Sequence, residues 1–356
     1  MWIKDGSILE IHGGDIYRNE QVEIDFSVNV NPLGPPIKVT ETIRTKAGRI
    51  SCYPDMHCAQ LAKSLGRFEN VPEEFLICAN GAAEIIFSAV LAVKPKKALL
   101  LSPAFSEYER ALKLAGTNVS FYELREEEQF QVKEEIIDHI TPDIDMVFIC
   151  NPNNPTGQCI TADLAEDIAK KCEESECFLV IDECFIDFLD QPKGYEMKEK
   201  LSGFHNLLII KALTKLFCMP GLRLGYGMCS DREFLLRMRA ALQSWNVSVL
   251  AQEGGIAAVE DCMDYMEETK VLIRKERRYL TEELKKLGFR IYGSLANYIF
   301  FKDLLCRERS LYNEALTAGF LIRDCSDYRG LSFGYYRIAV RTHAENERII
   351  TWLRQL

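Results

Sequence analysis

Short apolar runs alternate with amphipathic stretches through the middle of the chain. Continuous apolar runs of this length, separated by helical patterns, are typical of strands that are buried on both faces of a mostly parallel sheet. The pattern therefore predicts an α/β fold in which a mostly parallel sheet lies between helices. The runs cover residues 75–80, 98–105, 118–124, 146–151, 177–185, 206–213 and 222–228.

The helix predicted between the second and third runs shows how such helices are expected to begin and end. Ser106 and Glu109 have the spacing of a capping box, and Gly116 can end the helix in a left-handed conformation. A second capping box, made by Thr342 and Glu345, is expected to open the last helix of the chain. The apolar face of the first helix is formed by Tyr108, Ala111, Leu112 and Ala115.

The pattern of apolar and polar residues changes near residue 245. A long charged and amphipathic helical region over residues 250–287 is followed by shorter strand and helix patterns. We therefore predict a large domain over residues 41–245 and a smaller α+β domain over residues 246–356. Residues 1–40 are expected to form an arm that packs with the smaller domain, because this stretch is rich in Pro and Asn.

Composition and charge narrow the classes of partner. The 356 residues are 47% hydrophobic and 27% charged, ordinary values for a folded protein. The formal net charge of −10 disfavours a nucleic-acid partner, because affinity for a phosphate backbone comes from clustered cations. A local basic pocket for one small anion stays compatible with this charge.

The cysteines and the N-terminal sequence bear on the compartment. The 13 cysteines include no C-x-x-C pair, and several lie within apolar runs, which favours reduced and buried thiols. The first residues contain no apolar signal core, and no stretch has the length of a membrane span. We therefore expect a cytoplasmic protein with no membrane partner and no metal site.

Polar residues stand where several predicted strands end. Asp182, Lys215 and Arg223 follow apolar runs, Asn154 follows the run at 146–151, and the turn at 80–83 joins a strand to a helix. Ligands bind at this edge of an open parallel sheet, and the free N–H groups of a helix N-terminus attract anions. An amine, a carboxylate, a guanidinium, an amide and a helix N-terminus suit a cofactor with an aldehyde, a ring nitrogen and a phosphate.

Each of these residues also has an ordinary structural interpretation. Lys215 could be a solvated loop lysine, Asp182 could cap a turn, and Asn154 could simply form one. An aromatic residue that ends a strand, such as Phe105, is often part of the core. A lone arginine near a strand is usually a surface residue with an acidic partner.

The order of several motifs distinguishes between these interpretations. The chain resembles fold-type I enzymes that depend on pyridoxal 5'-phosphate (PLP), in the class I/II aminotransferase superfamily. Within it, the chain is most similar to the branch that histidinol-phosphate aminotransferases share with threonine-phosphate decarboxylases. The resemblance covers nearly the whole chain and rests on DFSVNVNPLGPP, YPD, NGAAE, SPAFSEY, NPNNPTG, VIDE, LTKLFCMPGLRLGY and YYRIAVR, in this order.

This resemblance implies roles for the residues at the strand ends. Lys215 corresponds to the lysine that forms a Schiff base with PLP and moves the Cα proton, and Asp182 to the partner of the ring nitrogen. Asn154 corresponds to a hydrogen-bond donor to the phenolic oxygen, and Phe105 to the residue that stacks on the ring. The expected phosphate contacts are Arg223, the backbone amides of Ala82 and Ala83, Thr214, and Tyr53 from a second subunit.

The resemblance also implies a homodimer with shared active sites and a small phosphorylated substrate. Arg337 and Arg323 correspond to arginines that hold anionic groups of the substrate, and Asn31 and His12 are expected as further substrate contacts. Two arginines that match by position make an anion clamp the better interpretation, because arginine binds carboxylate or phosphate in a bidentate manner. At Ala212 the family often has Ser or Thr, so one phosphate contact is missing or replaced.

Three resemblances favour one reaction of the branch. Phe185 stands where the aminotransferases typically have Tyr, and residues 12–18 and 321–341 look more like the decarboxylases. We therefore predict an L-threonine O-3-phosphate decarboxylase of cobalamin synthesis. The alternative is a histidinol-phosphate aminotransferase, which uses glutamate and 2-oxoglutarate in histidine synthesis. A PLP-fold protein that binds without turnover is a third reading, which the presence of Lys215 disfavours.

Overall fold

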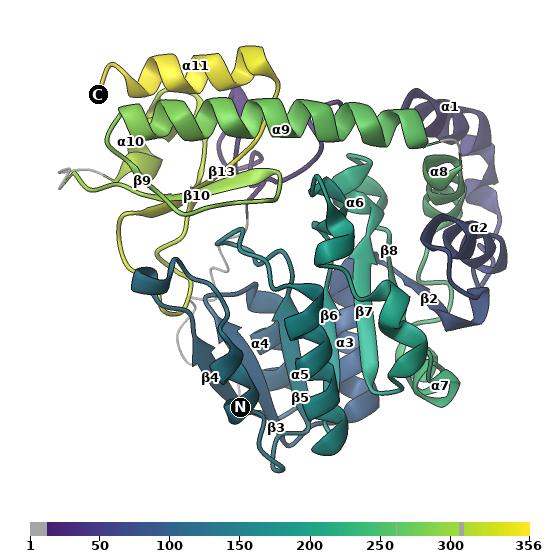
Figure 1. The fold of residues 1–356 in the computed structure, drawn as a ribbon. Helices are drawn as coiled ribbons and strands as arrows, with labels where there is room; N and C mark the ends of the chain where they lie inside the picture. Colours follow the sequence, from purple (N-terminus) through teal and green to yellow (C-terminus); the bar gives the residue numbers. More distant parts are fainter. Residues whose placement is uncertain (1–12, 261, 306–309) are drawn as a thin grey trace.

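The computed structural model describes residues 13–260, 262–305 and 310–356, and a seven-stranded sheet forms its larger unit (Figure 1). The order of the strands is β2-β8-β7-β6-β5-β3-β4, and β8 is antiparallel to β2 and β7 while the other neighbours are parallel. The strands are β2 Leu76–Ala79, β3 Lys97–Ser102, β4 Asn118–Glu123, β5 Met146–Cys150, β6 Phe178–Asp182, β7 Leu207–Ala212 and β8 Gly225–Met228.

Each of the seven apolar runs overlaps one of these strands, so the prediction of a mostly parallel sheet is confirmed. All residues of β2, β5 and β8 are buried. Helices cover both faces of such strands, which explains why their sequences are continuously apolar rather than alternating. The edge strand β4 is the exception, because only one of its residues is fully buried.

Helices of the larger unit lie on both faces of this sheet (Figure 1). On one face α3, α4 and α7 pack against β3 and β5, through residues such as Ile85, Tyr108 and Phe234. On the other face α5 and α2 pack against β5, β6 and β7. The helices are α1 Ile37–Lys46, α2 Ala59–Glu69, α3 Gly81–Val93, α4 Ser106–Leu114, α5 Ala162–Glu174, α6 Leu213–Leu216, α7 Arg232–Ala241, α8 Val249–Val259, α9 Met263–Lys286, α10 Leu311–Thr317 and α11 His343–Leu353.

A four-stranded antiparallel sheet in the order β12-β13-β10-β9 forms the smaller unit, which α9 and α11 cover (Figure 1). A separate parallel pair joins β1, near the N-terminus, to β11, which brings the N-terminal segment to this unit. The strands are β1 Ile24–Asp25, β9 Arg290–Ile291, β10 Tyr298–Lys302, β11 Phe320–Leu321, β12 Arg323–Asp324 and β13 Tyr335–Ala339.

The predicted helical region at 250–287 is two helices, α8 and α9. Although α8 follows the predicted boundary at residue 245, it packs against α1 and α2 of the larger unit. The domain boundaries therefore stay a prediction. None of the helices in the described ranges is both long and apolar enough to cross a membrane.

The two predicted capping boxes have different outcomes. The one made by Thr342 and Glu345 is present at the start of α11. The one predicted for α4 is wrong, because Phe105 occupies the N-cap position and its side chain makes no capping hydrogen bond. The Glu109 carboxylate lies instead 2.6 Å from the Lys113 ammonium, which follows it by four residues on the same helix.

Candidate active site

A cavity of about 330 Å³ lies where the parallel strands end, between the larger and the smaller unit. Its wall brings together most of the residues that the sequence singled out. The larger unit contributes Ala82, Ala83, Phe105, Asn154, Asp182, Thr214, Lys215 and Arg223, and the smaller unit contributes Arg323 and Arg337.

The N-terminus of α3 and the Arg223 guanidinium form a cradle for an anion. A Cβ atom on Gly81 would lie 2.6 Å from Nη2 of Arg223, and a Cβ atom on Gly225 would lie 2.4 Å from the backbone nitrogen of Ala82. Only glycine permits these close approaches, and Gly81 also has a φ of +82°. The first N–H groups of a helix lack partners within the helix, so they and the guanidinium can together bind a phosphate.

Asp182 ends β6, and its carboxylate is held from two sides. The backbone N–H of Cys184 donates to Oδ1 at 3.0 Å, and the hydroxyl of Tyr108 donates to Oδ2 at 2.7 Å. In the sequence, Tyr108 stands out only as part of the apolar face of a helix, and this contact was not predicted. The signal that could have found it is a hydroxyl on the buried face of a helix that begins at the ligand-binding edge of the sheet.

Lys215 lies on α6, directly after β7, and its environment favours the neutral amine. Burial lowers its pKa to about 8, the positive charges of Arg337 and Arg223 act in the same direction, and Cys184 and Asp182 oppose them. A lysine with such a pKa is a better nucleophile and base near neutral pH than an ordinary surface lysine.

The two arginines of the smaller unit are almost fully buried in the cavity wall. Arg337 donates from Nη2 to the backbone oxygen of Ser27 at 2.7 Å and from Nη1 to Oδ1 of Asn154. Its Nε atom is buried and has no hydrogen-bond partner within the described residues. The Arg323 guanidinium pairs with Asp327 at 2.7 Å and lies over the ring of Tyr328, with 4.9 Å to its centroid.

Two predicted residues in the described part of the chain, Tyr53 and Asn31, do not line this cavity, and a third lies outside the described residues. Tyr53 is 80% exposed, and its ring lies 4.7 Å from that of Trp245. Asn31 is fully buried, and its amide donates to Leu216 and Thr269 of the surrounding structure rather than facing the cavity. His12 lies outside the residues that the structure describes.

Two further side chains, those of Ala212 and Thr214, lie where contacts to the cofactor phosphate are expected. Ala212 lines the cavity and supplies no hydroxyl there. The hydroxyl of Thr214 donates at 3.4 Å to the backbone oxygen of Leu224, so it is only weakly engaged and can turn toward an anion.

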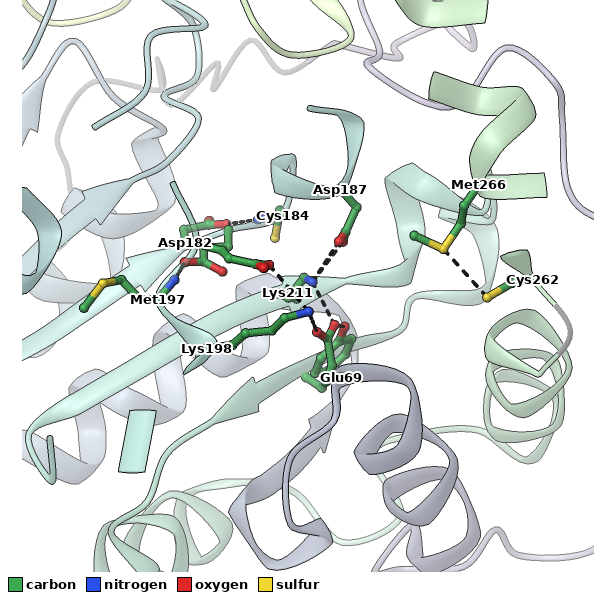
Figure 2. A network of polar contacts seen from close by, with 12 residues as sticks. Glu69, Asp182, Cys184, Asp187, Met197, Lys198, Lys211, Cys262 and Met266 are labelled. Carbon is green, nitrogen blue, oxygen red and sulfur yellow. Dashed lines mark hydrogen bonds and ion pairs between the residues drawn. The ribbon is translucent and has the colours of Figure 1, made fainter. Parts of the chain in front are cut away.

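A charged cluster lies on the face of the sheet opposite to the side chain of Asp182. Figure 2 shows three of its members, Glu69, Asp187 and Lys211. Asp182 pairs in register with Ile210, so Lys211, the next residue of β7, points to the other face. The Lys211 ammonium is 2.8 Å from Glu69 and 3.0 Å from Asp187, and Tyr226 on β8 donates its hydroxyl to Glu69. The cluster therefore ties β7 and β8 to α2 beneath the cavity.

Comparisons with known proteins agree with this architecture. Residues 21–353 match the family model for aminotransferase class I and II. Threonine-phosphate decarboxylase of Salmonella typhimurium is 35% identical, over 97% of this chain and 96% of its own. Histidinol-phosphate aminotransferase of Methanocaldococcus jannaschii is 26% identical, over 94% of this chain and 89% of its own.

A solved structure extends the agreement to the fold. The histidinol-phosphate aminotransferase from Clostridium acetobutylicum superimposes with a TM-score of 0.86 at 31% identity, and the match covers 93% of this chain and 98% of the other. These relatives imply PLP as the cofactor. The cavity fits it, because the Gly81 and Gly225 cradle can take a phosphate beside an amine of lowered pKa and a buried carboxylate. The chain belongs to the aminotransferase class I and II family.

Proposed function

We propose that this chain is a PLP-dependent enzyme that acts on a small phosphorylated amino acid, with L-threonine O-3-phosphate decarboxylase as the first choice. The observation that carries the proposal is the pair of buried arginines in the cavity wall, Arg323 and Arg337. O-phosphothreonine carries two anions, a phosphate and a carboxylate, and two guanidinium groups can bind one each. The 35% identity to the Salmonella typhimurium decarboxylase supports the same choice.

The residues of the large unit would hold PLP. The α3 N-terminus with Ala82 and Ala83, together with Arg223 and Thr214, would bind its phosphate, and Phe105 would stack on its ring. Asp182 would pair with the ring nitrogen and Asn154 with the phenolic oxygen. When bound, PLP withdraws electrons through its conjugated ring from a bond at the substrate Cα atom.

Which bond at Cα breaks then depends on how the residues of the cavity orient the substrate. If the two arginines hold the phosphate and the carboxylate so that the carboxylate lies out of the ring plane, the bond to the carboxylate carbon would break and CO2 would leave. A proton must then reach Cα, and Nζ of Lys215 can deliver it. The products are CO2 and an aminopropanol phosphate, which keeps the phosphate intact and balances the reaction.

The alternative is amino transfer from glutamate to form histidinol phosphate, as in histidine synthesis. Histidinol phosphate has no carboxylate, so both arginines would serve its phosphate. Phe185 favours the decarboxylase, because it lines the cavity without the hydroxyl that a tyrosine would offer at this position. The ring of Phe185 packs edge-on against Tyr298, with centroids 5.1 Å apart.

We further propose a homodimer in which Tyr53 contacts the phosphate of the neighbouring subunit's PLP. Tyr53 lies away from the cavity of its own chain and is 80% exposed. Ile37, Ile50 and Met56, which precede or follow it, are also exposed, and such apolar surface is typical of a protein interface. The cytoplasm is the proposed compartment, because the cysteines among the described residues are all free thiols.

Substrate turnover in the absence of a keto acid tests the reaction. PLP-loaded enzyme is given O-phospho-L-threonine, and CO2 and the amine product are measured over many turnovers. Steady release of both in equal amounts supports the decarboxylase. Sustained transfer from glutamate to imidazole-acetol phosphate, without CO2 release from O-phospho-L-threonine, supports the aminotransferase instead.

A further inference from the structure

Tyr108 places its hydroxyl on the carboxylate that faces the cofactor site. Its side chain is 1% exposed, and the hydroxyl is 2.7 Å from Oδ2 of Asp182. The phenol ring is stacked on Phe148, with centroids 5.2 Å apart, and contacts Phe105 edge-on at 5.6 Å. Packing between two rings therefore fixes the direction in which the hydroxyl points.

This hydroxyl is a donor throughout the working pH range. Burial and the neighbouring Asp182 charge raise the pKa of Tyr108 well above its usual value, so the phenol keeps its proton. A hydrogen bond from a neutral donor stabilises an ionised carboxylate and fixes the direction in which the carboxylate faces.

The other titratable groups near Asp182 come from three further segments. Cys150 ends β5, Cys184 follows β6, and Lys215 lies on α6, where Arg337 and Arg223 also act on it. Burial raises the pKa of the Cys184 thiol well above its usual value, and the pKa of the Cys150 thiol also rises, so both thiols stay neutral. Lys215 is the neighbouring cation, and Tyr108 is the neutral group that donates to the Asp182 carboxylate from α4.

We propose that Tyr108 is a positioning residue that holds the Asp182 carboxylate in the orientation in which it pairs with the protonated ring nitrogen of PLP. This inference rests on the proposed pairing of Asp182 with that nitrogen. Without the Tyr108 hydroxyl, Oδ2 of Asp182 loses its donor, and the carboxylate can turn away from the ring nitrogen that it pairs with. The ring nitrogen then loses its positive charge, and with it much of its ability to withdraw electrons.

The test is the variant Tyr108→Phe, which removes the hydroxyl and keeps the ring packed against Phe148. The matched control is Tyr226→Phe, because Tyr226, which pairs in register with Lys211, also donates a buried hydroxyl to a carboxylate, that of Glu69. Each protein is loaded with PLP labelled with 15N in the ring, and the 15N resonance reports whether the nitrogen carries a proton. Thermal unfolding of each apoprotein measures any loss of stability.

The expected result is a resonance that moves toward unprotonated pyridine in Tyr108→Phe and stays at the wild-type position in Tyr226→Phe. Removal of a hydrogen bond to a charged group predicts a fall in kcat of about tenfold to a hundredfold for Tyr108→Phe alone. A 15N resonance in Tyr108→Phe equal to a protonated wild-type value overturns the role of Tyr108. An unprotonated nitrogen in the wild-type enzyme instead overturns the assignment of Asp182, which separates the two failures.

Discussion

The guanidinium of Arg329 lies 2.9 Å from the Glu109 carboxylate and thereby ties the loop between β12 and β13 to α4. The same guanidinium lies 4.2 Å from the ring centroid of Phe121, and the hydroxyl of Ser102 donates to the backbone oxygen of Arg329 at 2.9 Å. The residue before it in the loop, Tyr328, lines the cavity. Arg329 therefore fixes part of the cavity wall without touching the cavity itself.

Exchange of the two charges tests the role of the ion pair between Arg329 and Glu109. We expect Arg329→Glu to raise KM for the phosphorylated substrate by about two- to fivefold and to leave kcat unchanged, because a partly exposed ion pair contributes little. The double variant Arg329→Glu with Glu109→Arg restores the opposite charges, so KM should return toward the wild-type value. Arg348, which pairs with Glu23 in the part of the chain near β1 and α11, gives a control in Arg348→Glu. A KM of the double variant as high as that of Arg329→Glu would show that the ion pair does not position the loop.

The lowered pKa of Lys215 predicts how fast the apoprotein binds PLP covalently. Only the neutral amine attacks an aldehyde, and its pKa is about 8 rather than the usual value near 10.5. The rate should therefore rise with pH and level off above about pH 8, as the ammonium form disappears. Stopped-flow absorbance of PLP mixed with apoprotein between pH 6 and 10 measures this rate. Lys215→Ala should show no covalent phase, and a rate still rising steeply at pH 10 would contradict the lowered pKa.

The fold was predictable where burial on both faces of the sheet leaves a continuous apolar signal. All seven strands of the large sheet lie in predicted runs, although the edge strand β4 has only one fully buried residue, and the candidate residues follow such runs because ligands bind where parallel strands end. Strands of two residues, such as β9, β11 and β12, are too short to leave a pattern of any period. They form through pairing with distant strands rather than through local sequence.

The parts of the site that were missed depend on contacts between distant residues. Tyr108 and Asp182 are 74 residues apart, and a tyrosine on a buried helix face gives no sign of its hydroxyl's partner. The predicted capping box at Ser106 failed for a related reason, since Glu109 is drawn to Lys113 and to the distant Arg329. Asn31 stands in a motif that suggested a substrate contact, but its side chain binds Thr269, 238 residues away.

Mixed dimers test whether Tyr53 acts in the neighbouring subunit. Lys215→Ala and Tyr53→Ala should each lower activity strongly as pure proteins, provided that Tyr53 binds the cofactor phosphate. A dimer with one chain of each kind contains one intact site, formed by Lys215 of one chain and Tyr53 of the other. After unfolding and refolding of an equal mixture, we expect about a quarter of the wild-type activity, because half of the dimers are mixed and half of their sites are intact. Activity no higher than the sum of the pure variants would show that Tyr53 does not act across the interface.

The charged cluster beneath the sheet predicts a large stability effect that is separable from catalysis. Lys211 is 1% exposed and contacts Glu69 and Asp187, so Lys211→Met leaves the half-buried Asp187 without this cation and leaves the buried Glu69 with only Lys198, 3.3 Å away. Removal of one partner from a buried ion pair typically costs about 3–5 kcal/mol of the free energy of unfolding. The urea midpoint of the apoprotein should fall accordingly, whereas Lys170→Met, which removes an exposed pairing with Glu166 on α5, should leave it nearly unchanged. Addition of Glu69→Gln to Lys211→Met should recover part of the loss, because it removes one of the two negative charges that Lys211 neutralises. Equal midpoints for Lys211→Met and Lys170→Met would mean that the cluster contributes no net stability.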